Sequence, residues 1–86
     1  MARVRKSGKS LRTAEHRALC ALLIEARRKV GLNQADIAKK LGRPQSFVAK
    51  YEGGERRLDV VEFLAVMRAL GADPIVIMRK VIRKTA

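Results

Sequence analysis

The sequence contains one cysteine and one histidine among its 86 residues. Cys20 has no second cysteine to pair with, so a disulfide within the chain is excluded. Cys20 and His16 together are too few to form a structural zinc site. We therefore predict no metal and no cofactor, and we expect Cys20 to be a small apolar residue on a helix.

Long apolar runs and aromatic residues are also scarce. No segment approaches the roughly 18 consecutive apolar residues of a membrane-spanning helix, and the N-terminal MARVRKSGKS lacks the apolar part of a signal peptide. We therefore expect a cytoplasmic protein. One Tyr and two Phe disfavour binding to single-stranded RNA, because such binding commonly stacks bases on aromatic rings. The sequence also offers no nucleophile paired with a base and no glycine-rich phosphate loop, which disfavours an enzyme.

Acidic residues are few compared with basic ones. Twenty Lys and Arg against eight Asp and Glu give a net charge of +12, which suits a polyanionic partner such as nucleic acid or an anionic membrane surface. An ordinary solvated surface is the alternative, although it would mix the signs more evenly. The length allows one domain. We predict a basic, flexible arm over residues 1–12, which includes Arg3, Arg5 and Lys6, and a folded domain over residues 13–86.

Apolar residues recur at helical spacing in five segments, and no segment has the pattern of a strand. Capping residues and glycines mark the ends of these segments. A compact all-α domain is therefore predicted, with helices at about 14–30, 34–41, 44–52, 60–70 and 74–84.

The second and third predicted helices are separated only by Gly42-Arg43-Pro44. Two short helices joined by a tight, glycine-containing turn are typical of a helix-turn-helix, whose second helix enters the DNA major groove. A plain helical hairpin with a solvated polar face is the alternative, and the net charge favours DNA. A helical projection of residues 44–52 places Pro44, Phe47, Val48 and Tyr51 on the inner face and Gln45, Ser46, Ala49 and Lys50 on the outer face.

The stretch GLNQADIAKKLGRPQSFVAKYEGGERR, residues 31–57, resembles the DNA-binding domain of the lambdoid phage repressors and Cro proteins, the XRE family. The resemblance includes Leu-x-Gln-x-x-Ile-Ala at the second helix, Gly42 in the turn, and Glu52-x-Gly54 after the third helix. It implies a repressor-like helix-turn-helix fold and a bacterial or phage transcriptional regulator. Such a regulator would bind a palindromic site on double-stranded DNA as a homodimer and act as a repressor.

The resemblance also implies roles for individual residues. Gln45 would read a base, and Ser46, Ala49 and Lys50 would continue the reading face. Phe47 departs from the small polar residue common at its position, and we expect it to complete the core rather than to touch a thymine methyl group. The residues expected to contact phosphates are Asn33 and Gln34, at the start of the second helix, and Arg43, Arg56 and Arg57, which flank the third.

Two further predictions concern packing. Arg27 lies at the edge of an apolar stripe and needs a carboxylate there, and the resemblance nominates Glu52 for a structural ion pair. The last helix has a wide apolar face, which predicts a dimer interface, unless a single core needs all of it. A rival hypothesis is an antitoxin that binds its own promoter and a toxin protein. The predicted interface consists of Ile75, Ile77, Met78, Val81 and Ile82.

Overall fold

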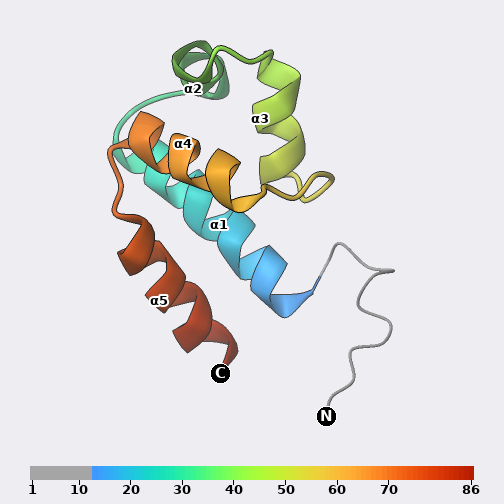
Figure 1. Cartoon of the computed structure of the whole chain (residues 1–86), viewed down its shortest axis with the longest axis vertical. Coiled ribbons are helices and arrows are strands. Elements are labelled where there is room, and N and C mark those ends of the chain that lie inside the picture. Colours follow the sequence, from blue (N-terminus) through green and yellow to red (C-terminus); the bar gives the residue numbers. More distant parts are fainter. Residues whose placement is uncertain (1–12) are drawn as a thin grey trace.

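The computed structural model describes residues 13–86 as five helices joined by short turns (Figure 1). This part of the chain has no strand, so the predicted all-α class is confirmed. None of its helices is both long and apolar enough to cross a membrane. Arg3, Arg5 and Lys6 of the predicted arm lie outside the described residues. The helices are α1 (Ala14–Lys29), α2 (Gln34–Leu41), α3 (Gln45–Glu52), α4 (Val60–Leu70) and α5 (Pro74–Thr85).

Side-chain caps start four of the five helices. A cap accepts a hydrogen bond from a backbone N–H group that the first helical turn would otherwise leave unpaired. Two of these caps are complete capping boxes, in which the third residue of the helix bonds back to the cap. The caps are Thr13 for α1, Asn33 with Asp36 for α2, Asp59 with Glu62 for α4, and Asp73 ahead of Pro74 for α5.

The turn between α2 and α3 depends on Gly42. Its φ of 66° lies in the left-handed region, which costs glycine little because it has no Cβ. Pro44 was expected at the first helical position, but it lies just before α3, with an extended ψ of 153°. This correction has a simple cause, because a residue at the cap position is extended while its carbonyl already accepts a helical bond. The Pro44 carbonyl accepts from the backbone N–H of Phe47 at 3.0 Å.

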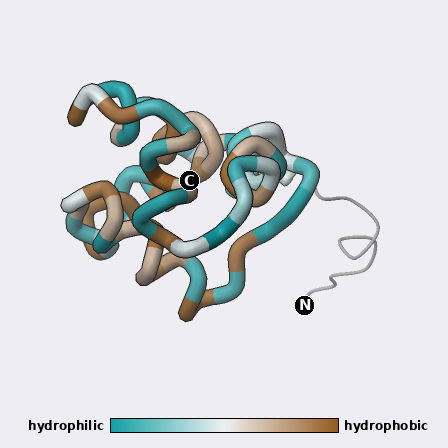
Figure 2. Tube along the Cα trace, turned by 90° about the horizontal axis from the view of Figure 1, so that it is seen from above, coloured by the Kyte–Doolittle hydropathy of each residue, from teal (hydrophilic) through white to brown (hydrophobic). Residues whose placement is uncertain are grey.

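One apolar core joins all five helices. Helix α1 packs against α5 and α3, and α2 packs against α3 and α4, so α2 and α3 lie together at one end of the molecule while α5 lies at the other (Figure 1). Hydrophobic and hydrophilic residues alternate along the helices, as amphipathic packing requires (Figure 2). The largest fully buried side chains are Leu23, Ile37, Val48, Tyr51, Val66 and Met67.

Candidate nucleic-acid interface

The two faces of α3 differ sharply in exposure. Phe47, Val48 and Tyr51 are buried in the core, so the expectation that Phe47 completes the core is confirmed. The opposite face carries short polar side chains and one long cation, which lets another backbone approach closely. This outward face, called the α3 face below, consists of the exposed residues Gln45, Ser46, Ala49 and Lys50.

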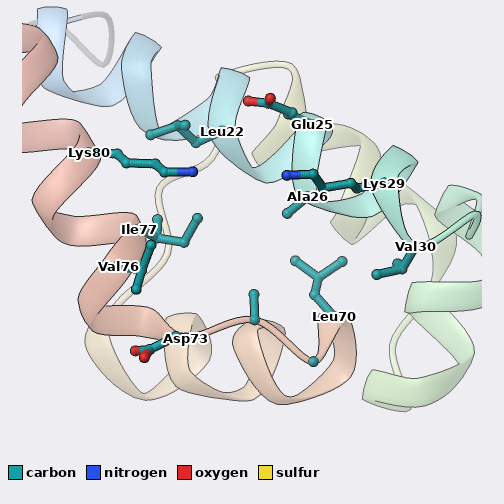
Figure 3. Close-up of a pocket in the computed structure, with 12 residues that line it drawn as sticks. Leu22, Glu25, Ala26, Lys29, Val30, Leu70, Asp73, Val76, Ile77 and Lys80 are labelled. Atoms are coloured by element: carbon teal, nitrogen blue, oxygen red, sulfur yellow. The ribbon is translucent and has the colours of Figure 1, made fainter.

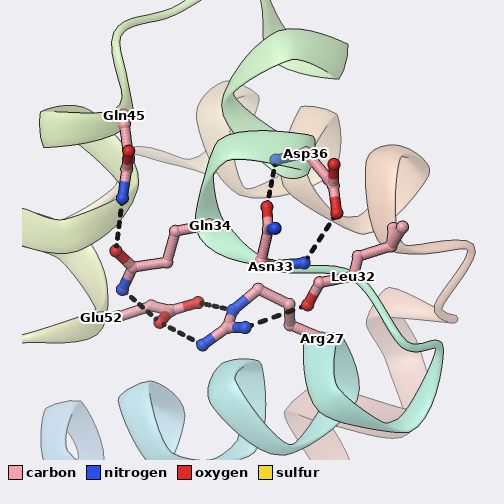
Figure 4. Close-up of polar contacts among 7 residues, drawn as sticks. All are labelled: Arg27, Leu32, Asn33, Gln34, Asp36, Gln45 and Glu52. Atoms are coloured by element: carbon pink, nitrogen blue, oxygen red, sulfur yellow. Dashed lines mark hydrogen bonds and ion pairs between the residues drawn. The ribbon is translucent and has the colours of Figure 1, made fainter.

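A chain of polar contacts runs from inside the domain to the α3 face (Figure 4). Glu52 is buried, and its carboxylate accepts from Arg27 Nε at 2.7 Å and from Arg27 Nη2 at 3.1 Å. Arg27 also donates to the Leu32 carbonyl at 3.0 Å. The predicted pair of Arg27 and Glu52 is therefore present, and it ties α1 to the last residue of α3. The hydrogen bond to Glu52 raises the pKa of Arg27.

Gln34 extends this chain to the surface (Figure 4). Its Nε2 donates to Glu52 Oε1 at 2.9 Å, and its Oε1 accepts a longer bond of 3.4 Å from Gln45 Nε2. Gln34 was expected to bind a phosphate, but both polar atoms of its side-chain amide form hydrogen bonds within the protein. We name the connected residues Arg27, Glu52, Gln34 and Gln45 the polar relay. The link from Glu52 to Gln34 has no local sequence signal, because the two residues are 18 positions apart.

Asn33, the other residue expected to grip a phosphate at this end of α2, serves as its cap. Its Oδ1 accepts from the backbone N–H of Asp36 at 2.8 Å, and the Asp36 carboxylate accepts from the Asn33 backbone N–H at 2.9 Å. Asn33 is an exposed residue, and its side-chain amide nitrogen takes no part in the capping box. A phosphate contact by Asn33 stays a prediction.

The flanking arginines converge on one carboxylate. Arg56 donates to both oxygens of Glu62, at 2.9 and 2.8 Å, and Arg43 Nη2 donates to Glu62 Oε2 at 3.3 Å. Both guanidinium groups lie over the Phe47 ring, 4.3 and 4.9 Å from its centroid. Hydrogen bonds from Arg56 and from the Asp59 backbone N–H lower the pKa of Glu62 to about 2. We call Arg43, Arg56, Glu62 and Phe47 the arginine cluster; Arg57, the third flanking arginine, is exposed beside it.

The spacing of Asp59 and Glu62 indicates a capping box and nothing more. The arginine partners of Glu62 are six and 19 positions away, across the turns on either side of α3, so helical spacing could not connect them. Residues 13–86 contain no group of three or more His, Cys, Asp or Glu side chains that could hold a metal ion.

The predicted dimer residues divide into two groups. Ile77 and Val81 are buried in the core of the single chain, so a second chain cannot reach them. Ile75 and Ile82 are 58% and 65% exposed, and Met78 is half-buried. Fewer α5 residues are therefore left for a contact with a second chain than the sequence predicts, because α5 uses one side of its apolar face to pack on α1.

A cavity of about 260 Å³ lies between α1, the α4–α5 turn and α5 (Figure 3). Its lining is mostly apolar and includes Leu22, Ala26, Leu70 and Ile77. The ammonium groups of Lys29 and Lys80 approach it from facing helices (Figure 3). The cavity shares no residue with the α3 face, the polar relay or the arginine cluster.

Solved structures with this arrangement are known. An XRE-family-like protein from Pseudomonas syringae pv. tomato str. DC3000 is 48% identical, with a TM-score of 0.79, over 85% of this chain and 89% of that one. The restriction-modification controller protein C.Esp1396I, solved as a tetramer in complex with its natural 35-base-pair operator, is 18% identical with a TM-score of 0.75, over 84% of this chain and 95% of its own. The clp gene regulator ClgR from C. glutamicum is 20% identical with a TM-score of 0.77, over 87% and 97%.

The two more distant structures share the fold of this chain. No curated protein sequence matches it. Residues 18–77 match the family described as a helix-turn-helix domain. This match spans most of the chain, and the Pseudomonas protein is similar over nearly its whole length. The chain therefore belongs to the XRE family of helix-turn-helix proteins.

Proposed function

We propose that this protein is a transcriptional regulator that binds a specific sequence of double-stranded DNA and acts as a repressor. The observation that carries the proposal is the α3 face, an exposed and mainly polar surface on a helix whose other side is buried in the core. A helix held in this way can enter a major groove, where amide and ammonium groups bond to base edges. C.Esp1396I, which has the same fold, was solved in complex with its operator, and this supports DNA binding as the use of the fold.

Base contacts are assigned to the α3 face, and phosphate contacts are assigned to residues around it. Gln45 and Ser46 lie in the first turn of α3 and Lys50 about one and a half turns further on, so they reach successive bases. Phosphate contacts, which position the protein without reading sequence, are assigned to residues on either side. These are Asn33, Arg43, Arg56 and Arg57, the arm residues Arg3, Arg5 and Lys6, and the start of α2 at Gln34, where the helix dipole favours an anion.

Selection of bound fragments from a random duplex pool tests this function. We expect enrichment of one palindromic site, because two copies related by a twofold axis place their recognition helices about one DNA turn apart. Recovery of unrelated sequences at equal frequency would contradict sequence-specific binding. Repression is tested separately, with a reporter gene placed downstream of the selected site.

Phosphate contacts make a quantitative prediction about salt. The logarithm of the binding constant should fall with the logarithm of salt concentration, with a slope of about −0.9 for each phosphate contacted. Replacing Arg3, Arg5 and Lys6 together with Ala should make this slope shallower. The matched control replaces Arg68, Arg83 and Lys84 with Ala, since these three exposed cations lie on α4 and α5, outside the residues assigned to DNA and outside the stripe of α5 assigned below to dimerisation. Equal flattening by both triple variants would show that net charge matters and that the arm makes no phosphate contact.

Dimerisation is assigned to the exposed apolar stripe of α5. Ile75, Met78 and Ile82 recur at the spacing i, i+3, i+7, which places them on one side of the helix. A matching stripe on a second copy would cover them. The side of α5 that carries Ile77 and Val81 already faces α1, so the dimer leaves the fold of each chain unchanged.

Replacing Ile82 with Asp should dissociate the dimer while preserving the fold. Burying two carboxylates at a symmetric contact costs about 3 kcal/mol, or roughly a hundredfold in the dimer dissociation constant. Analytical ultracentrifugation and circular dichroism measure the two outcomes. Val60→Asp is the control, because Val60 is 74% exposed but lies on α4. A dimer that survives Ile82→Asp would place the interface elsewhere.

A further inference from the structure

Three charged side chains from separate parts of the chain meet beside the start of α3. Arg43 precedes α3, Arg56 lies in the turn after it, and Glu62 belongs to the first turn of α4. Two guanidinium groups brought this close repel each other unless an anion lies between them. Glu62 supplies that anion, with Nη2 of both arginines donating to its Oε2.

Glu62 is itself held in place. Its Oε1 accepts from the backbone N–H of Asp59 at 3.0 Å as part of the capping box, so the carboxylate cannot follow the arginines to other positions. Its low pKa keeps it ionised at neutral pH. The buried Phe47 ring adds a second fixed surface, because guanidinium groups are attracted to aromatic faces. The cluster therefore restrains two side chains that would otherwise sample many rotamers.

The restrained arginines still have donors to offer. Of the five N–H groups of a guanidinium, Arg56 uses three, two for Glu62 and one for the Arg57 carbonyl. Within residues 13–86, Arg43 uses one of its five N–H groups. The side chain of Arg56 is 39% exposed and that of Arg43 is 44% exposed, so an anion in solution can reach both. With two positive charges and one negative, the cluster keeps a net positive charge.

We propose that Glu62 is a positioning residue that holds Arg43 and Arg56 as a preformed site for one backbone phosphate of the bound DNA. This inference rests on the proposed function and deepens it, because it assigns an acidic residue to the support of a DNA contact. Simple charge counting predicts the reverse, that an acid near the interface weakens binding. The preformed site avoids much of the conformational entropy that free arginine side chains would lose on binding.

The test compares Glu62→Gln with Glu55→Gln on the selected duplex. Both variants remove one negative charge near α3, but Glu55 is exposed and its side chain makes no hydrogen bond or ion pair within residues 13–86. Glu62→Gln should weaken binding about fivefold to tenfold and make the salt slope shallower by about 0.9 per chain. Glu55→Gln should bind as well as the wild type or better. Tighter binding by Glu62→Gln, with a steeper slope, would overturn the proposal, since Glu62 would then compete with the phosphate.

A purely structural role of Glu62 is separated by a double-mutant cycle. Glutamine keeps an oxygen that can accept from the Asp59 N–H, and thermal unfolding of each variant verifies the fold. In an Arg43→Ala, Arg56→Ala background, Glu62→Gln should have no further effect on DNA affinity, because Glu62 acts through these arginines. An undiminished effect in that background would overturn the proposal.

A readout without DNA separates this inference from the proposed function. Nitrogen-15 NMR of arginine side chains can follow titration with inorganic phosphate. The Nε signals of Arg43 and Arg56 should shift in the wild type and shift much less in Glu62→Gln. If these phosphate-induced shifts were observed but the protein bound no duplex, the proposed function would be contradicted and the anion site would still be supported. Equal shifts in both proteins, or none in either, would overturn the site even if the wild type binds DNA.

Discussion

Replacing Glu52 with Ala is expected to destabilise the protein by roughly 3–5 kcal/mol. The Glu52 side chain is 4% exposed and accepts three hydrogen bonds, two from Arg27 and one from Gln34. Its removal leaves the Arg27 guanidinium largely buried without a counter-charge. Small domains have a free energy of unfolding of about 5–15 kcal/mol, so this loss is a large share of the total. Urea denaturation followed by circular dichroism measures it.

Two controls separate charge burial from simple loss of a side chain. Glu55→Ala removes an exposed carboxylate three positions along the chain, and we expect a change within about 0.5 kcal/mol. A double variant, Arg27→Met with Glu52→Leu, removes both charges and fills the space with apolar atoms. It should be far more stable than Glu52→Ala, because no unpaired charge stays buried. A loss below about 1 kcal/mol for Glu52→Ala would mean that water reaches Arg27 and replaces the carboxylate.

The helices of this fold could be predicted because their signals are local. Asn33 with Asp36 and Asp59 with Glu62 are capping boxes within one helical turn, and Gly42 marks the end of α2 by its conformational freedom. Helical spacing likewise separated the buried Phe47 from the exposed α3 face. Each of these inferences depends on residues within a few positions of one another, so no tertiary contact was needed.

The site could be predicted only in part because its supporting contacts are long-range. Glu62 meets Arg43, and Gln34 meets Glu52, only after the helices have packed, and no periodicity links such pairs. The apolar face of α5 shows the same limit. The width of this face predicts one contact with the chain's own core and a second contact with another chain. Only the packing of α5 on α1 reveals that Val81 belongs to the core and Ile82 does not. The pattern of the sequence therefore nominated the residues proposed to read bases and the Arg27–Glu52 pair, but not the contacts of Gln34 and Glu62.

The polar relay orients the side-chain amide of Gln45, the residue that we propose reads a base. A carboxylate only accepts hydrogen bonds, so the Gln34 amide must direct its Nε2 to Glu52 and its Oε1 towards Gln45. Gln45 must then direct one N–H of its own amide to Gln34. Its Oε1 and its second N–H stay available, and these are the two groups that pair with N6 and N7 of adenine. The buried ion pair therefore orients a residue that is itself exposed.

Gln45→Ala should cost roughly 1–3 kcal/mol on the selected site and leave binding to random duplex nearly unchanged. Lys50→Ala should behave similarly, through the loss of a contact to guanine O6 or N7. The sequence alone suggests that Gln34→Ala weakens both kinds of binding by similar factors, as loss of a phosphate contact would. The relay changes this expectation, because without Gln34 the Gln45 amide can rotate. Gln34→Ala should therefore also lose discrimination, by less than Gln45→Ala does.

Competition between the selected site and random duplex, at one fixed salt concentration, measures these differences for each variant. The ratio of the two affinities is the informative quantity, because it cancels changes in nonspecific attraction. If Gln45→Ala lowered both affinities equally, Gln45 would be touching phosphates, and α3 would not be the helix that reads the sequence. If Gln34→Ala left the ratio unchanged, the 3.4 Å bond to Gln45 would have no part in orienting it.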